Sequence, residues 1–286
     1  QGFVGSAIRE GLKNFYSVRG YDLNPEKCFN LKWMNKLDEV ANHSDIVFVC
    51  VPTPMRKDGS CDTRILESAI KDLDNSCVKI GRIATRPIVV IKSTIPPGTT
   101  ERIGKQYIGR ENEEPDMHIC FSPEFLTEAN SFEDFKNQSR IIIGGSGAKI
   151  VKQMFRKPFP NIPIVITHSK TAEMVKYFIN CFLATKVTFA NQMYQICLDN
   201  NIDYDKVCEY ALYDARIGKS HLAVPGPDGD LGFGGHCFPK DLAAMITFAK
   251  LNDGDTSFLE SVQEFNDKCR RMRDWELMKG RAVSDD

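Results

Sequence analysis

Short runs of β-branched and other apolar residues alternate with helical patterns through the first 168 residues, and this alternation constrains the fold most strongly. The continuous apolar runs occupy residues 46–51, 88–91, 118–121, 141–143 and 162–166. A strand that is buried on both faces gives a continuous run of this kind. Amphipathic segments such as 63–73 and 99–107 lie between the runs. The pattern therefore predicts an α/β domain, a doubly wound parallel sheet with helices on both faces.

The N-terminal segment has the pattern of the second half of a dinucleotide-binding turn. Gly2 and Gly5 stand at the start of a short amphipathic segment, residues 6–13, and residues 16–21 read as a strand that ends at Asp22. Glycine lets the backbone approach a pyrophosphate at a helix N-terminus, and an acidic residue at the next strand end can accept from ribose hydroxyls. Such an acidic residue favours NAD over NADP. The first glycine and first strand of the motif are missing, and Asp22 taken alone could be an ordinary turn residue.

Polar side chains stand at the ends of several predicted strands. These residues are Asp22, Thr53, Thr94 and Glu124. Ligands of open α/β sheets bind outside the carboxyl ends of the strands. Each residue alone could be structural, and it is their shared position that indicates a binding edge. Glu124 and Glu128 would share a face if their segment is helical, either as a solvated acidic surface or as groups that manage water and protons.

One long helix is predicted in the middle of the chain. No glycine or proline occurs between Pro163 and Gly218, and apolar residues recur there at helical spacing. The pattern predicts a helix of about 30 residues, which is about 45 Å long. Lys176 and Asn180 interrupt its apolar surface one turn apart. They could form a polar edge stripe, or they could point into a site and stabilise an oxyanion or hold a water.

Residues 232–241, GFGGHCFPKD, place a cysteine between a run of glycines and a predicted helix. Pro239 suits the first turn of that helix. Backbone N–H groups and the positive helix end favour the thiolate form of Cys237, which is the nucleophilic form. Lys240 and Asp241 would add a cation and a carboxylate nearby. The alternative is a glycine-rich turn with an inert, buried cysteine.

Composition argues against several classes of protein. The formal net charge is −1, from 37 basic and 38 acidic residues, and no basic block indicates a nucleic-acid surface. No apolar run approaches the roughly 18 residues of a membrane span, and no signal peptide is evident. The ten cysteines are scattered without a C-x-x-C pair, and the five histidines do not cluster. We therefore expect no metal site and no disulfide framework, and we expect a reducing, cytoplasmic compartment.

Together these stretches resemble the UDP-glucose/GDP-mannose dehydrogenase family over nearly the whole chain. Further matching stretches are VPTP at 51–54, KSTIP at 92–96, FSPEFL at 121–126, EMVKY at 173–177 and RIG at 216–218. The resemblance implies a two-step, NAD-dependent oxidation of the C6 alcohol of a nucleotide sugar to a carboxylate, with UDP-glucose as the expected substrate. It also implies a homodimer, because the family residue that matches Arg216 reaches the substrate of the neighbouring subunit.

The resemblance further implies roles for individual residues. Cys237 would attack the intermediate aldehyde and give a thiohemiacetal, then a thioester, which keeps the aldehyde oriented for a second hydride transfer. Lys176 and Asn180 would stabilise the oxyanion, Asp241 would position water, and Glu124 would assist thioester hydrolysis. The residues implied for NAD are Gly2, Gly5, Asp22, Lys27, Thr53, Thr94, Glu128 and Lys240. Those implied for the sugar nucleotide are Glu124, Phe125, Leu126, Glu128, Lys176, Asn180, Arg216, His221, Gly226 and Gly234.

The expected organisation has three parts. They are an NAD-binding Rossmann-like domain at 1–168 that lacks its first strand, a long connecting helix at 169–200, and a helical dimerisation and active-site domain at 201–286. Residues 227–231, PDGDL, are an insertion relative to the family pattern, and the family's third, nucleotide-sugar domain is expected to be absent. Two alternatives remain open: the substrate could be GDP-mannose or a UDP-N-acetyl sugar, or the chain could be a truncated, weakly active NAD-binding dimer.

Overall fold

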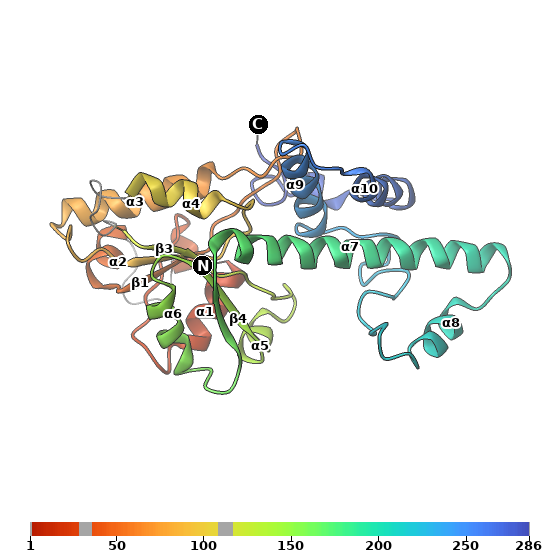
Figure 1. Cartoon of the computed structure of the whole chain (residues 1–286), viewed down its shortest axis with the longest axis horizontal. Coiled ribbons are helices and arrows are strands. Elements are labelled where there is room, and N and C mark those ends of the chain that lie inside the picture. Colours follow the sequence, from red (N-terminus) through yellow and green to blue (C-terminus); the bar gives the residue numbers. More distant parts are fainter. Residues whose placement is uncertain (1, 29–35, 108–116, 286) are drawn as a thin grey trace. The chain divides into compact units, whose positions relative to one another are not determined.

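The computed structural model describes residues 2–28, 36–107 and 117–285. The chain forms two compact units, the first from residues 1–53 and 63–176 and the second from residues 54–62 and 177–286. Figure 1 shows the elements of both units coloured along the sequence. Among the described helices, none combines the length and the hydropathy that crossing a membrane requires.

A five-stranded sheet forms the centre of the first unit, with the strands in the order β1-β2-β3-β4-β5. Their bounds are Ile46–Val49, Ile88–Ile91, Ile119–Phe121, Ile141–Gly145 and Ile164–Thr167. The first three strands are parallel, β4 runs antiparallel to β3, and β5 is parallel to β4. The predicted Rossmann-like class is confirmed. The departure from a wholly parallel sheet lies at β3 and β4, which as antiparallel neighbours need no crossover.

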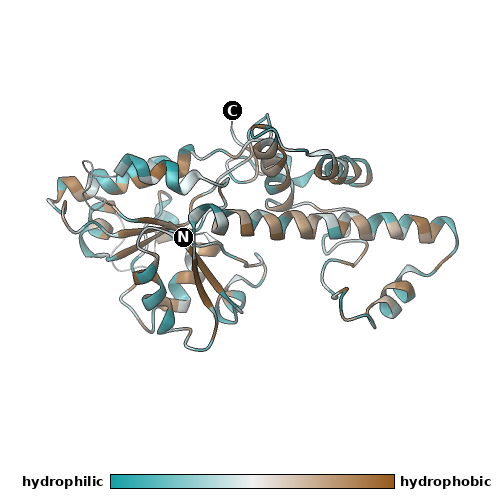
Figure 2. Ribbon diagram, in the orientation of Figure 1, coloured by the Kyte–Doolittle hydropathy of each residue, from teal (hydrophilic) through white to brown (hydrophobic). Residues whose placement is uncertain are grey.

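Helices cover both faces of this sheet (Figure 1). They are α1 Phe3–Leu12, α2 Leu37–His43, α3 Arg64–Lys79, α4 Thr99–Gly104, α5 Ser131–Lys136 and α6 Ala148–Arg156. Successive side chains of a strand point to opposite faces. Val90 of β2 accordingly joins a core with α1, α5 and α6, whereas Val89 and Ile91 join a second core with α3 and α4. Figure 2 shows the strands as strongly hydrophobic, as the continuous apolar runs predict.

One local prediction for this unit is wrong, and one condition that the sequence left open is not met. Residues 16–21 form no strand, since the sheet of the described residues contains only β1 to β5. A strand needs a neighbour whose backbone groups face it, and no described strand pairs with this segment. Residues 122–127 are not helical, so Glu124 and Glu128 do not share a helix face. Pro123 disfavours the helical conformation in the residue before it, and two lysine side chains occupy the carbonyls of Pro123 and Glu124.

The long helix is present as predicted. It is α7, Ser169–Asp199, and it has 31 residues. The second unit also contains α8 Tyr204–Ala211, α9 Phe238–Lys250, α10 Ser257–Cys269 and the short 3-10 helix η3 Asp274–Leu277. Side chains of α7 and α9, among them Tyr177, Ala184 and Leu242, form its main core.

The sequence pattern from residue 256 to about residue 278 predicts a final helix of that length, but the helix in the structure is shorter. It ends at Cys269, and Arg270 has an extended backbone with φ −77° and ψ 133°. The guanidinium of Arg270 bonds to the carboxylates of Asp228 and Asp274. Asp228 is 42 residues from Arg270 in sequence, so helical periodicity did not reveal this contact.

Candidate active site

The carboxyl ends of β1 and β2 bring two predicted cofactor residues together. The Thr53 hydroxyl donates to the carbonyl of Thr94 over 2.7 Å, and both residues are buried. Neighbouring parallel strands end at the same edge of a sheet. Glu124 follows β3 and therefore belongs to this edge as well. The structure thus assembles three of the four predicted strand-end groups.

The start of α1 suits a pyrophosphate group. Gly2 is the N-cap, no side chain caps the helix, and its first turn carries no acidic residue. A Cβ added at Gly2 would meet open space, and one at Gly5 would lie 3.8 Å from Cβ of Cys50. An uncapped helix start without negative charge is what an anion requires.

The other predicted cofactor residues of the first unit are more exposed. The Asp22 carboxylate is half-buried and accepts from the Asn24 N–H over 2.9 Å, so it also serves the turn that the sequence allowed as its alternative role. Lys27 is exposed on the 3-10 helix Pro25–Cys28. Glu128 is exposed in the turn that follows residues 122–127.

Two lysines hold the segment that carries Glu124. Lys176 Nζ donates to the Glu124 carbonyl over 2.8 Å and to its Oε1 over 2.9 Å. Lys92 Nζ donates to the carbonyl of Pro123 over 2.9 Å, and the N–H of Leu126 donates to Glu124 Oε2 over 2.6 Å. The side chains of Lys176 and Glu124 are only 6% and 10% exposed. Glu124 and Lys176, both predicted from the sequence, thus form one buried group.

This environment fixes the charge of Glu124. Burial acts to raise the pKa of its carboxyl, but the charge and hydrogen bond of Lys176, the Leu126 N–H and the charge of Lys92 outweigh burial, so the pKa is lowered. For Lys92, burial lowers the pKa to about 8, against the raising effects of Cys50 and Glu124. Glu124 is therefore a carboxylate at neutral pH, the form that can accept a proton from water.

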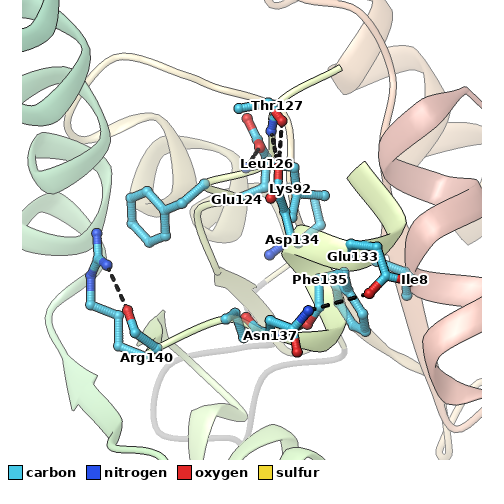
Figure 3. A pocket seen from close by; sticks show the side chains of 13 residues that line it. Ile8, Lys92, Glu124, Leu126, Thr127, Glu133, Asp134, Phe135, Asn137 and Arg140 are labelled. Carbon is cyan, nitrogen blue, oxygen red and sulfur yellow. Dashed lines mark hydrogen bonds between the residues drawn. The ribbon is translucent and has the colours of Figure 1, made fainter. Parts of the chain in front are cut away.

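A pocket of about 320 Å³ opens beside this segment (Figure 3). Phe125 lies at its wall, with the Arg140 guanidinium 4.2 Å and the Lys176 ammonium 5.7 Å from the ring centroid. The lining residues are Ile8, Lys92, Glu124, Phe125, Leu126, Thr127, Glu133, Asp134, Phe135, Asn137, Gln138, Ser139 and Arg140. An aromatic ring among carboxylate, amide and cationic groups suits a small polyhydroxylated ligand.

In the second unit, Cys237 stands where the sequence predicts it, at the start of a helix. It is the N-cap of α9, it is half-buried, and Pro239 lies in the first turn. No side chain caps this helix, and the Cys237 carbonyl accepts from the Asp241 N–H over 2.9 Å. The thiol is therefore at the positive end of a 13-residue helix.

Asp241 is the centre of a buried polar group. Asn180 Nδ2 donates to its Oδ2 over 2.5 Å, and the Lys240 ammonium pairs with its Oδ1. Burial acts to lower the pKa of Lys240, but the charge of Asp241, with Cys237 and Cys61, outweighs burial and raises it. Lys240 is therefore a permanent cation that is electrostatically coupled to Cys237. The structure places this predicted cofactor residue in an ion pair with the predicted water-positioning residue.

Four predicted substrate residues, Arg216, His221, Gly226 and Gly234, lie in the connection between α8 and α9. The exposed Arg216 pairs with Asp214, with N–O distances of 2.5 to 3.1 Å. The ring of His221 lies 5.7 Å from that of Phe238, between centroids, and the Gly226 N–H donates to a backbone carbonyl over 2.8 Å. Gly234 lies in the loop just before Cys237.

Sequence reasoning missed the side chains that hold that loop. The N–H groups of Gly232, Phe233 and Gly235 donate to Asn191, Asn266 and Asp274, respectively. These three N–H groups are thus used to support the loop, whereas the helix start at Cys237 has no side-chain cap. The sequence does contain a sign of these contacts. Asparagine is unfavourable inside a helix, so Asn191 and Asn266 within helical segments indicate that their side chains have partners.

Comparison with known proteins shows what the chain is similar to. Residues 23–158 match the NAD binding domain of the UDP-glucose/GDP-mannose dehydrogenase family, and residues 170–268 match the central domain of the same family. The first match lies mostly in the first unit and the second mostly in the second unit.

Individual relatives agree with the family match. The UDP-glucose 6-dehydrogenase TuaD of Bacillus subtilis is 32% identical over 269 residues, which is 92% of this chain and 56% of that protein. The UDP-glucose 6-dehydrogenase of Rhizobium meliloti is 32% identical over 248 residues, 84% of this chain and 54% of that protein. A solved UDP-glucose dehydrogenase of Pyrobaculum islandicum has a TM-score of 0.80 at 29% identity, covering 93% of this chain and 66% of that one. The chain thus spans little more than half the length of the two curated relatives.

Proposed function

Since the chain belongs to the UDP-glucose/GDP-mannose dehydrogenase family, we propose that it oxidises the C6 hydroxyl of a nucleotide sugar to a carboxylate with NAD as the oxidant. The proposed substrate is UDP-glucose and the product UDP-glucuronate, because the curated relatives described above are named UDP-glucose 6-dehydrogenases. The observation that carries the proposal is the buried group of Asn180, Asp241 and Lys240 at the start of α9, the helix that Cys237 caps.

The first unit carries the family's NAD-binding domain, and its residues fit the cofactor. The uncapped start of α1 at Gly2 and Gly5 is proposed to bind the pyrophosphate, and Asp22 is proposed to bind the ribose hydroxyls. Thr53 and Thr94 are proposed to contact the cofactor at the carboxyl ends of the strands. The remaining proposed contacts are Lys27, Glu128 and Lys240. NAD supplies the hydride acceptor for both oxidation steps.

Cys237 is the proposed nucleophile. Its sulfur bonds to the carbon of the intermediate aldehyde and gives a thiohemiacetal. The aldehyde oxygen takes up the proton that the thiol loses. Loss of a hydride and that proton leaves a thioester. Lys176 and Asn180 are proposed to stabilise the negative charge that develops on this oxygen. Lys240 supports the thiolate through its charge.

Thioester hydrolysis completes the proposed reaction. Asp241, held by Asn180 and Lys240, is proposed to position the water. Glu124, ionised beside two lysines, is proposed to accept a proton from it. Water breaks the carbon–sulfur bond, the acid leaves, and the thiol is restored. The sugar nucleotide is proposed to contact Glu124, Phe125, Leu126, Glu128, Lys176, Asn180, Arg216, His221, Gly226 and Gly234.

The proposed activity is tested with the purified chain, NAD and a panel of UDP-glucose, GDP-mannose and UDP-N-acetylmannosamine. We expect UDP-glucose to give the highest rate, with two NADH formed for each acid because the reaction removes two hydrides. A preference for another sugar would replace the substrate, one NADH per product would contradict the two-step route, and no NADH with any of the three would contradict the activity.

We also propose that the protein is a homodimer that pairs through α7. Phe178, Phe182 and Phe189 are 70%, 60% and 59% exposed, and the rings of the first two stack at 6.5 Å. Their spacing of four and seven residues places them on one face of the helix. A contiguous exposed aromatic face of this kind marks an interaction surface. The exposed Arg216 is proposed to reach the substrate bound by the partner.

The cytoplasm is the proposed compartment. All ten cysteines lie in the described parts of the chain, and none of them is in a disulfide. Disulfides form and persist in oxidising compartments, so ten reduced cysteines favour a reducing one.

A further inference from the structure

The loop that precedes Cys237 is held by side chains from other elements. Asn191 of α7 accepts from the Gly232 N–H over 2.9 Å. Asn266 of α10 makes two bonds to Phe233, accepting from its N–H over 2.7 Å and donating to its carbonyl over 3.0 Å. Asn191 is 1% exposed and Asn266 2% exposed, so water does not compete for these bonds.

A third contact fixes the end of the loop. Asp274 of η3 accepts from the Gly235 N–H over 2.9 Å through one carboxylate oxygen. Its other oxygen accepts from Arg270 over 2.9 Å, and the same guanidinium nitrogen reaches Asp228 over 2.6 Å. We call the three acceptors Asn191, Asn266 and Asp274 the loop clamp. Its members come from three separate elements, so the clamp fixes the loop against the body of the second unit.

The glycines of the loop are explained by the closeness of this clamp. Gly232 has φ +68°, and a Cβ there would lie 2.3 Å from Oδ1 of Asn266. A Cβ on Gly234 would lie 2.3 Å from Oδ1 of Asp274. Non-bonded atoms do not approach so closely, so a side chain at either glycine would displace the clamp.

We infer that Asn266 is a positioning residue for Cys237, which it holds in place at the start of α9 through both backbone groups of Phe233. This inference rests on the proposed role of Cys237 as the nucleophile. One amide that pairs with both the N–H and the carbonyl of a residue fixes the direction of the chain as well as its position.

Phe233 also contacts a residue that follows Cys237 in the sequence. The Phe233 ring packs edge to face against Phe238, with centroids 6.1 Å apart. Phe238 is the residue directly after Cys237 and the first of α9. Phe233, which Asn266 holds, therefore contacts Phe238 on the C-terminal side of Cys237. Cys237 thus lies in the sequence between two residues that contact each other.

The test uses thiol labelling of the full chain, with Asn266→Ala and the matched control Asn252→Ala. The exposed Asn252 side chain donates to the Phe248 carbonyl over 2.7 Å. Iodoacetamide modifies thiolates, and peptide mass spectrometry separates the rate at Cys237 from the rate at Cys208, a half-buried thiol of α8. Cys208 thus reports any general loosening of the same unit.

Asn266→Ala is expected to slow labelling of Cys237 at pH 7 by about fivefold or more relative to Cys208, because a released loop lets the thiol leave the positive N-terminal end of α9, where Cys237 is the N-cap. Asn252→Ala should stay within about twofold of the parent protein. Asn266→Asp keeps an acceptor for the Phe233 N–H but loses the donor, so an intermediate rate is expected. An unchanged Cys237 rate in Asn266→Ala, or an equal change at both thiols, would overturn the inference.

A second variant covers the case in which Asn266→Ala does not fold. Asn266→Asp then decides, with about a threefold slowing at Cys237 alone supporting the inference and a rate within about twofold of the parent protein overturning it. Labelling requires neither NAD nor sugar, so its outcome is independent of the proposed reaction. In the active protein, the positioning role also predicts a kcat about tenfold lower with the KM for NAD within about twofold.

Discussion

At the scale of single residues, Glu124 illustrates how buried neighbours set the charge of a candidate catalytic group. Its carboxyl has an ordinary pKa of 4.5, and in the folded protein the pKa is lower, since burial is outweighed by Lys176, Leu126 and Lys92. A lowered pKa means that ionised Glu124 stabilises the folded state above about pH 4.5. That contribution is lost as the pH falls through the lowered value.

The lysine that does not contact the carboxylate directly gives a test of this account. Lys92→Met removes one positive charge, so the pKa of Glu124 should rise. A 13C NMR titration of the Glu124 carboxyl measures the change, and Lys149→Met, which alters an exposed lysine of α6, should leave the pKa where it is. A titration midpoint that is the same in Lys92→Met and the parent would show that Lys92 does not act on Glu124.

The residue scale is also where the sequence was least informative. Cys237, Asp241 and Lys240 are adjacent in one motif, so their grouping could be predicted. Asn266 is 33 residues from the peptide it holds, and its helix reads as an ordinary amphipathic segment. A side-chain contact of that span depends on how α10 packs, which neither periodicity nor spacing specifies.

At the scale of elements, the start of α7 is tied to the loop that leads into α4. Glu173 is fully buried and accepts from the Gly98 N–H over 2.6 Å and from the Thr100 N–H and hydroxyl over 2.8 and 2.6 Å. Gly98 is the N-cap of α4 with φ +95°. A carboxylate here satisfies the uncapped start of one helix from the first turns of another.

Removing this carboxylate should destabilise the first unit. Glu173→Ala leaves three buried donors unpaired and should cost on the order of 3 kcal/mol in the free energy of unfolding. Glu173→Gln keeps one acceptor oxygen and should cost less. Urea unfolding measures both, with Glu101→Gln as the control, because that side chain is 44% exposed. If Glu173→Ala and Glu101→Gln were equally stable, the buried contact would not be important.

Prediction of elements from the sequence succeeded where a local pattern decides the structure. All five apolar runs gave strands, and the residues of β2 and β3 are buried along the whole strand. Helix α7 formed because no glycine or proline interrupts its pattern. The segment 16–21 contains Tyr16, Val18 and Tyr21, which are common in strands, but it has no described strand to pair with. The end of α10 at Cys269 was missed for a similar reason, since Arg270 bonds to Asp228, which is 42 residues away in sequence.

At the scale of the whole molecule, the exposed aromatic face of α7 predicts self-association. Phe182→Glu should convert a dimer into a monomer, because a charge would then be buried in the proposed interface. Sedimentation velocity measures the mass, and Phe258→Glu serves as the control, since Phe258 is also exposed, at 64%, but belongs to α10. A parent chain that sediments as a monomer, or a Phe182→Glu protein that remains a dimer, would contradict pairing through this face.

The central claim is that Cys237 forms the covalent intermediate of a two-step oxidation, and Cys237→Ser tests it most directly. The measurement is acid formation from UDP-glucose and NAD, with Cys208→Ser as the matched control in the same unit. The account predicts that Cys237→Ser lowers acid formation by about a thousandfold or more, because the serine hydroxyl is a far weaker nucleophile than a thiolate, and that Cys208→Ser retains the parent rate. A Cys237→Ser protein that forms UDP-glucuronate at the parent rate would contradict the account.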